Sequence, residues 1–528
     1  MLICGMQVEG LDTAAITVIN ELKTNYELRI KTIQAQYTSL QNEYDILKEK
    51  YDLLVYRRFA RSAEQLLAET KQKLLFAEEP EQPGLEAKEE APELQAVKTF
   101  TRKKAGRKPL SENLPRRERV IAINEDDKTC DCGAKLSRIG EETSEKLHII
   151  PPEIYVEKVI RPKFACRCCE GTENEGKAAV RIAPVEPSII PRSIASPSLL
   201  STIITQKFEM HLPYYRQEKQ FANIGACISR QDMSNWQQQV YKRITPLLTL
   251  LKDIVRNGPV LQMDETTVQV IGEEGRDDKL KSRMWLARGG PPGTRILWYE
   301  YHPTRAAYHA KEFLEGYSGH LQTDGYNGYD CAVKDMPEII QVGCFAHARR
   351  KFFEASKTSK KPQSAEEGIK YIRRLYDLED SLRSQELNES MFLEKRKQAA
   401  EKILSEFREW LLIRHNELLP SSLLGEAVGY MLNQWDKLVA YLDSPYLTPD
   451  NNACENAIRP FVLGRKNWLF CQSPQGAESS CAMYSLIETA RQNDIVPFKY
   501  LMALFEKVPL AVSAEDWEKL LPWNIFTP

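Results

Sequence analysis

Three carboxylates stand in contexts that would let them hold divalent metal ions. Asp264 follows an apolar run expected to be a strand, Asp324 ends another expected strand, and Glu455 lies inside a late expected helix. Two aspartates on adjacent strands and one acid from a helix form an oxygen cage for two cations, which can bind both the attacking and the leaving oxygen in phosphoryl transfer. Acids at strand ends are often merely solvated. The three residues are therefore a hypothesis for a metal-dependent phosphoryl-transfer site.

Basic and imidazole side chains lie near these acids in the sequence. Arg459 is four residues after Glu455, so both share one helix face and the guanidinium could hold a phosphate beside the metals. His347 lies three residues after Cys344. We expect it to hydrogen-bond an active-site carboxylate or the scissile strand, while a structural role and a zinc site on Cys344 and His347 stay open. Further phosphate contacts are expected from Arg349, Arg350, Arg465 and Lys466.

Two cysteine clusters have the composition of zinc knuckles. Cys130 and Cys132 form the first, and Cys166, Cys168 and Cys169 the second. Zinc prefers four soft ligands in a tetrahedron, which two such pairs supply. We expect one structural Zn²⁺ on Cys130, Cys132, Cys166 and Cys169. Only one residue separates the first pair, a fifth cysteine competes, and reduced cysteines in turns remain the alternative.

The elements that position these residues belong to several domains. A chain of 528 residues allows roughly three or four domains, and its 42% hydrophobic content suffices for a large core. Its 72 basic and 74 acidic residues nearly cancel, so any nucleic-acid affinity must come from local patches. No apolar run approaches the roughly 18 residues of a membrane span. Twelve cysteines are too sparse for a disulfide scaffold. We expect a soluble, intracellular protein without a membrane partner.

A heptad repeat runs through the N-terminal segment. Its seam comprises Ile30, Tyr37, Tyr44 and Tyr51 at one position and Ile33, Leu40, Leu47 and Leu54 three residues later. This 3.5-residue period predicts a leucine-zipper-like coiled coil over residues 14–77, most simply a parallel homodimer. A long amphipathic helix packed on its own chain is the alternative.

The charge then changes sign twice. Residues 78–97 are acidic and proline-containing, which is typical of a linker. Residues 98–119 are basic and could lie along a DNA minor groove, although most charge runs are merely solvated. The residues expected to contact DNA there are Arg102, Lys103, Lys104, Arg107, Lys108, Arg116 and Arg117. The zinc-binding domain is expected over residues 120–195.

Residues 196–257 are expected to be helical and to contain a helix-turn-helix. Residues 214–221 suit one helix, Gly225 permits the turn, and Ser229 can cap a second helix. That second helix would present Arg230 and Gln231 to a major groove. An ordinary helical hairpin is the alternative.

Residues 258–477 are expected to form an α/β core. Strand-like segments between residues 260 and 342 alternate with two helices, which outlines a mixed sheet. An all-α insertion is expected over about residues 358–445, followed by a helix that starts at Asp450 or Asn451. Residues 478–528 form a C-terminal helical segment. The fold class is thus multidomain α+β.

Several motifs carry a family resemblance. They are QMDET at Asp264, QTDGYNGY at Asp324, GCFAHARRKFFEA around Cys344, DNNACENAIRPFVLGRKNWLF around Glu455, and GRKPLSENLPR in the basic segment. With them the chain resembles a DDE transposase of the insertion-sequence-sixty-six family over nearly its whole length. The resemblance implies a ribonuclease-H-like core with a helical insertion before the glutamate. It also implies that Asp264, Asp324 and Glu455 are the catalytic triad.

The function expected from these features is DNA transposition. Two Mg²⁺ (or Mn²⁺) ions would support cleavage at the ends of an insertion sequence and strand transfer into target DNA. The N-terminal parts would bind the terminal repeats, and the coiled coil would pair two ends in a homodimer or larger synaptic complex. The resemblance also suggests small accessory proteins and a cytoplasmic, nucleoid-associated location in a prokaryote. A DNA-binding regulator derived from a transposase and a structure-specific nuclease on the same fold are the alternatives.

Overall fold

In the computed structural model, most of the described residues lie in the C-terminal two thirds of the chain. The described residues are 13–59, 154–165, 180–358 and 362–526. The chain divides into two compact units, residues 79–158 and the rest, and every described helix and strand belongs to the larger unit. The expected zinc ligands Cys130, Cys132, Cys166 and Cys169, the acidic linker and the basic segment lie outside the described residues.

A single long helix, α1 (Thr13–Phe59), contains the heptad repeat. Its seam side chains are exposed, from 53% for Ile30 to 68% for Leu47. The helix touches the rest of the unit near its end, where Leu53 is buried and Arg57 pairs with Glu354 at 2.7 Å. Because Leu53 is not a seam residue, the seam does not pack on its own chain. The helical expectation is met over the described part of residues 14–77.

The expected helical hairpin lies where the sequence predicted it. Helix α3 (Tyr214–Asn223) leads through Gly225, whose φ of 86° suits glycine, to α4 (Arg230–Arg243). The Ser229 hydroxyl accepts the N–H of Asp232 at 3.1 Å and so caps α4. Arg230 and Gln231 are located at the start of α4, where both side chains are exposed. The flanking helices are α2 (Pro197–Phe208) and α5 (Thr245–Arg256).

A mixed sheet follows these helices and has the strand order β5-β4-β3-β6-β7. Strand β4 is antiparallel to both of its neighbours, β3 and β5, whereas β6 and β7 run parallel to β3. This agrees with the expected succession of three strands, a helix, a strand, a helix and a further strand. The elements are β3 (Val260–Val270), β4 (Lys281–Gly289), β5 (Ile296–His302), α6 (Ala307–Leu314), β6 (Gly319–Gln322), α7 (Asn327–Val333) and β7 (Ile339–Val342).

The β5 edge of this sheet is covered by α14 (Pro474–Gln492). Ser485 Oγ accepts the N–H of Tyr299 at 2.9 Å, and Thr489 Oγ1 accepts the N–H of Leu297 at 3.0 Å. An uncovered edge strand would present these N–H groups to other chains. The hydroxyls of α14 therefore satisfy the backbone of β5 and block edge-to-edge pairing.

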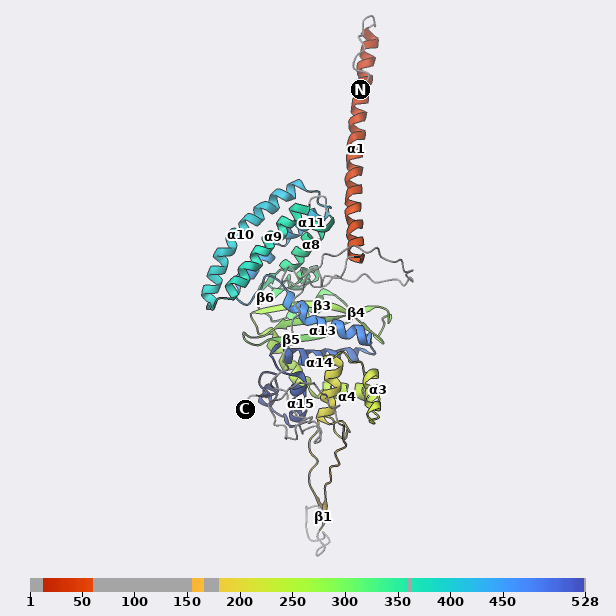
Figure 1. Ribbon diagram of the computed structural model, residues 1–528, viewed down its shortest axis with the longest axis vertical. Coiled ribbons are helices and arrows are strands. Elements are labelled where there is room, and N and C mark those ends of the chain that lie inside the picture. The colour runs from red at the N-terminus through yellow and green to blue at the C-terminus, as the bar shows by residue number, and fades with distance from the viewer. Residues whose placement is uncertain (1–12, 60–153, 166–179, 359–361, 527–528) are drawn as a thin grey trace, which may run out of the picture. The chain divides into compact units, whose positions relative to one another are not determined.

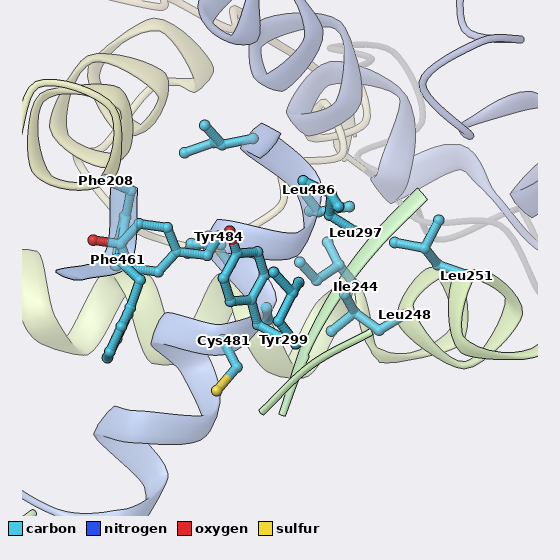
Figure 2. Close-up of a cluster of buried hydrophobic side chains, with 14 of the residues drawn as sticks. Phe208, Ile244, Leu248, Leu251, Leu297, Tyr299, Phe461, Cys481, Tyr484 and Leu486 are labelled. Carbon is cyan, nitrogen blue, oxygen red and sulfur yellow. The ribbon is translucent and has the colours of Figure 1, made fainter. Parts of the chain in front are cut away.

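One hydrophobic core contains side chains of the sheet, of helices that precede the sheet in sequence and of helices that follow it. Figure 2 shows Phe208 of α2, Tyr299 of β5, Phe461 of α13 (Asn452–Trp468) and Tyr484 of α14 in one cluster. The Tyr484 ring lies 5.1 Å from that of Phe208 and 5.4 Å from that of Phe461. The boundaries expected near residues 257 and 477 are therefore not packing boundaries.

A second core belongs to the expected helical insertion, which Figure 1 draws as a group of helices in teal and cyan. Its centre contains Phe352 of α8 together with Phe407 and Trp410 of α10. Arg396 is fully buried and pairs with Glu379 at 2.7 Å. The elements are α8 (Phe345–Thr358), α9 (Pro362–Arg383), α10 (Glu389–Glu417), α11 (Leu423–Asn433), α12 (Trp435–Val439) and a 3₁₀ turn, Ala440–Asp443.

Short elements complete the described chain. Strand β8 (Phe470–Cys471) pairs with the end of β3, and a two-stranded ribbon precedes α2. Among the described residues, no helix is long and apolar enough to cross a membrane. The remaining elements are β1 (Lys163–Ala165), β2 (Val180–Ile182), α15 (Pro497–Lys507), a 3₁₀ turn (Val508–Leu510) and α16 (Ala514–Lys519).

Candidate active site

Asp264 lies on β3, and Asp324 lies two residues beyond the end of β6, the parallel strand beside β3. In the register of β3 and β6, Gln262 lies opposite Gln322, and each aspartate comes two residues later. Because side chains alternate along a strand, Asp264 shares a sheet face with Gln262. The Gln262 amide donates to Gln322 Oε1 at 2.7 Å. The sheet register thus brings the Asp264 backbone and the segment that carries Asp324 to the same end of two paired strands.

The segment before α13 attaches Glu455 to the same region. The Asn451 side-chain amide donates to the Met263 carbonyl, next to Asp264, at 3.1 Å. The Gln322 amide donates to the Thr448 carbonyl at 2.8 Å. Both bonds fix the start of α13 against the strands that carry the aspartates. Glu455, in the first turn of that helix, is 5% exposed.

Neighbouring acids contribute to the raised pKa values of Asp264 and Glu455. Burial raises the pKa of Asp264 well above its usual value, and the Glu265, Glu455 and Asp324 carboxylates raise it further. Burial raises the pKa of Glu455 to about 7, with Asp450 and Asp324 adding to the shift and Arg350 and Arg459 opposing it. Clustered buried carboxylates repel one another unless a proton or a cation neutralises them. Their oxygen atoms suit hard divalent cations such as Mg²⁺ and Mn²⁺.

His347 lies beside Glu455, as the sequence suggested for an active-site carboxylate. Its Nδ1 is 3.6 Å from Glu455 Oε1, and neither of these buried atoms has a hydrogen-bond partner among the described residues. Burial lowers the pKa of His347 to about 4, helped by Arg350 and Lys351 and opposed by Asp324. The imidazole is therefore neutral at physiological pH and lies close to two of the three acids.

The basic residues predicted around the site divide into two groups. Arg350 and Arg459 act on the Glu455 carboxylate, and Lys466 is exposed at the end of α13. Arg349 instead lies near Tyr376 and Arg373 of the insertion, and burial lowers its pKa. Arg350 and Arg459 are therefore placed to meet a phosphate near the acids, whereas Arg349 lies toward the insertion.

Arg465 differs from the expectation that it contacts DNA. Its guanidinium donates to the Thr267 hydroxyl at 2.7 Å, to the Thr266 hydroxyl at 3.3 Å and to the Thr267 carbonyl. Burial lowers its pKa. The side chain therefore fastens α13 to β3, because the helix packs against that strand and leaves the guanidinium beside its hydroxyls. As placed, the side chain is a structural tie between α13 and β3.

A second charged group, which sequence reasoning missed, lies on the other face of β3. Glu265 is bonded by Arg305 and by the Tyr329 hydroxyl, the latter at 2.7 Å. The Arg305 guanidinium stacks on the Tyr326 ring at 3.6 Å, and the Tyr326 N–H donates to Asp324 Oδ1 at 2.9 Å. This group therefore braces the turn that carries Asp324. A charged residue next to Asp264 in an apolar strand was the available signal for Glu265, while nothing in the sequence marked Arg305.

Comparison with known proteins identifies the class. A family profile described as Transposase IS66 family matches residues 192–479. Three further profiles match residues 127–170 (zinc-finger binding domain of transposase IS66), 485–523 (IS66 C-terminal element) and 46–119 (Transposase C of IS166 homeodomain). The class defined by these matches is that of the transposases. Within it, the chain belongs to the IS66 family, which confirms the resemblance predicted from the motifs.

Relatives of similar length occur in Sinorhizobium fredii. The chain is 31% identical over 490 residues to a protein described as uncharacterized protein y4hP, covering 88% of this chain and 85% of the relative. It is 29% identical over 427 residues to uncharacterized protein y4jD, covering 79% of this chain and 81% of the relative. The similarity therefore extends along most of both proteins.

Proposed function

We propose that this chain binds the ends of an insertion sequence and catalyses metal-dependent strand cleavage and strand transfer for transposition. The observation that carries the proposal is the placement of Asp264 on β3 and of Asp324 just beyond the end of the paired strand β6, with the buried Glu455 raising the pKa of Asp264. Membership of the IS66 family supports it. We further propose that the sheet is a ribonuclease-H-like core, since its first three strands are antiparallel and the next two parallel, in the order β5-β4-β3-β6-β7.

In this proposal Asp264, Asp324 and Glu455 hold two Mg²⁺ (or Mn²⁺) ions. When bound, such ions activate the attacking oxygen and stabilise the leaving oxygen of an in-line displacement. Arg350 and Arg459 hold the scissile phosphate against the acids. Neutral His347 lies 3.6 Å from the Glu455 carboxylate. The brace of Glu265, Arg305 and Tyr326 keeps the Asp324 turn in place.

The DNA contacts of the proposal lie mainly in the N-terminal half. They comprise one Zn²⁺ on the four predicted cysteines, the basic segment 98–119, and the start of α4 with Arg230 and Gln231. The α1 seam pairs two chains, so that two element ends meet in one complex. Small accessory proteins and a nucleoid-associated location in a prokaryotic cytoplasm belong to the same proposal.

The test uses purified full-length protein and labelled element ends, with and without Mg²⁺ or Mn²⁺. Asp264→Asn, Asp324→Asn and Glu455→Gln should each remove most cleavage, because the three acids hold the ions together. End binding should survive, because it depends on basic residues elsewhere. Asp335→Asn is the matched control, since Asp335 is exposed and pairs only weakly with Lys311 at 3.3 Å.

Asp450 is unsuitable as that control, although the sequence suggested it as a simple helix cap. Its carboxylate does accept the Asn452 N–H at 3.0 Å, but it is buried and raises the pKa of Glu455.

Three outcomes count against the proposal. Cleavage without strand joining would favour a structure-specific nuclease. End binding without cleavage, whichever metal ion is added, would favour a DNA-binding regulator. Cleavage by the Glu455→Gln variant at the wild-type rate would exclude the assigned triad.

A further inference from the structure

Three potential metal ligands of different chemistry converge beside the acidic cluster. The Cys344 sulfur, a ring nitrogen of His347 and a carboxylate oxygen of Glu455 all lie within 4.8 Å of one another. Cys344 immediately precedes α8, His347 lies in the first turn of α8, and Glu455 lies in the first turn of α13. The Phe345 N–H donates to the Pro449 carbonyl at 2.9 Å, so the start of α8 is tied to the segment that leads into α13.

The separations suit a tetrahedral ion. Zinc bonds of about 2.0–2.3 Å place neighbouring ligand atoms roughly 3.3–3.7 Å apart. His347 Nδ1 and Glu455 Oε1 are 3.6 Å apart. All three ligand atoms lie within 4.8 Å of one another. Three protein ligands and one open position are the arrangement of zinc sites that exchange a water or substrate ligand.

Two of these donor atoms lack partners in the described part of the chain. Glu455 Oε1 and His347 Nδ1 are buried there without a hydrogen bond, and the Glu455 side chain is 7% exposed. Buried polar atoms are normally satisfied, and each exception requires an explanation. A cation between the two atoms would satisfy both at once.

Burial and the nearby Asp450 and Glu455 carboxylates raise the pKa of the Cys344 thiol, so its thiolate would form only with a bound cation, while two N–H groups oppose the shift. The Asn451 N–H donates to Cys344 Sγ at 3.3 Å, and the His347 backbone N–H also bonds to it. Hydrogen bonds from N–H groups stabilise a thiolate, which is the metal ligand. The same bonds would anchor an ordinary buried thiol, and serine would keep them. Cys344→Ser therefore removes the metal ligand while preserving its hydrogen-bond acceptor.

We propose that Cys344, His347 and Glu455 form a transition-metal site that takes a Zn²⁺-class ion and competes with the hard cations for Glu455. Thiolate and imidazole donors suit Zn²⁺ and Co²⁺, whereas Mg²⁺ keeps to oxygen ligands. An ion held by this trio withdraws Glu455 from Asp264 and Asp324. Zinc is then an inhibitor of Mg²⁺-dependent cleavage, a consequence that rests on the proposed function, whereas the site itself does not.

Cobalt spectroscopy on the full chain tests the site directly. Thiolate-bound Co²⁺ produces sulfur-to-metal charge-transfer absorption. The cysteines of the predicted zinc finger contribute the same absorption in wild type and in the variants, so only the difference between the proteins reports on Cys344. Cys344→Ser should lose part of this absorption and one equivalent of bound Co²⁺. His347→Gln should lose the same equivalent of Co²⁺. It leaves the buried Cys344 thiol unchanged and alters a side chain that is 22% exposed.

Cys454→Ser is the matched control, because Cys454 is a buried thiol adjacent to Glu455 in sequence but outside the trio. Its cobalt spectrum should equal that of wild type. A Cys344→Ser spectrum identical to wild type, or unchanged cobalt stoichiometry in His347→Gln, would overturn the proposal.

Zinc inhibition separates this inference from the proposed function. For each protein we compare the Zn²⁺ concentration that halves its own Mg²⁺-dependent cleavage rate. This concentration should be at least about tenfold higher for Cys344→Ser than for wild type, because the variant has lost one of three zinc ligands. Equal zinc sensitivity would overturn the competition. If wild type cleaves no element end at all, the proposed function fails, while the cobalt difference still decides the metal site.

Discussion

Gln262 and Gln322 join β3 to β6 by a side-chain hydrogen bond of 2.7 Å, two residues before Asp264 and Asp324 respectively. The pair extends in both directions. Arg288 donates to Gln262 Oε1 at 2.7 Å, and Gln322 donates to the Thr448 carbonyl at 2.8 Å. A single buried chain of polar groups therefore spans β4, β3, β6 and the segment before α13, which are the elements that carry or support the three acids.

Breaking this chain should impair chemistry more than DNA binding. Gln322→Leu leaves the Gln262 amide and the Thr448 carbonyl without these partners, which costs about 1–3 kcal/mol. We expect a lower unfolding midpoint, cleavage slower by about tenfold or more, and unchanged affinity for element ends. Parallel gel-shift and cleavage assays measure the two effects. Equal losses of binding and cleavage would show global damage instead of a displaced acid.

Removing one member of the buried Arg396–Glu379 pair should destabilise the helical insertion. Arg396 also donates to the Tyr441, Ser444 and Leu447 carbonyls at 2.9, 2.8 and 2.6 Å, which fixes the return of the chain toward α13. Arg396→Met should cost up to roughly 3–5 kcal/mol, because it removes one of the two guanidinium partners of a buried carboxylate and leaves only Arg383. Hydrogen exchange in α9 and α10 reports this local stability.

The double variant Arg396→Met/Glu379→Leu is the control for that result. Replacing both charges removes the poorly paired carboxylate, so exchange should slow relative to Arg396→Met alone. Exchange that is faster still in the double variant would mean that the bonds to the carbonyls, and not the ion pair, carry the stabilisation.

Glu488 should make the stability of the sheet-bearing core depend on pH. It is 3% exposed, and burial raises its pKa to about 7 although Arg491 opposes the shift. A raised folded-state pKa means that the folded protein holds the proton more tightly than the unfolded chain. Its contribution to stability is therefore complete below the unfolded value near 4.5 and is lost as pH rises through about 7. The loss amounts to roughly 3 kcal/mol.

Glu488→Gln keeps the shape of the side chain and removes its titration. Between about pH 5 and pH 8, the melting temperature of wild type should fall relative to that of the variant. Thermal unfolding followed by circular dichroism at both pH values measures this difference. Parallel curves for the two proteins would contradict the assignment.

The exposed seam of α1 should drive self-association of the full chain. Leu40→Asp places a charge in the apolar interface of the expected coiled coil, where an unpaired charge is costly. We expect the dimer dissociation constant to rise by about tenfold or more in sedimentation equilibrium. Ser39→Asp, one residue away and off the seam, should leave it unchanged. A wild-type chain that is monomeric at all practical concentrations would exclude the zipper.

Local patterns predicted much of this fold. The heptad repeat predicted a continuous helix through the described part of α1, and Gly225 and Ser229 located the α3–α4 hairpin. Strand-like segments around Asp264 and Asp324 predicted a mixed sheet. Such features depend on residues near one another in the chain, so they can be recognised before any tertiary contact is known.

The sequence by itself thus determined the family, the order of the elements and the three acids expected to act together. Only the tertiary structure decided where the neighbouring charges point. Arg465 turns to the hydroxyls of β3, Arg349 turns toward the insertion, and Arg305 reaches Glu265 across the sheet face. Cys344 and Glu455 likewise meet because the starts of α8 and α13 are tied together. These outcomes depend on packing and hydrogen bonding between segments far apart in the chain, which no local pattern of residues records.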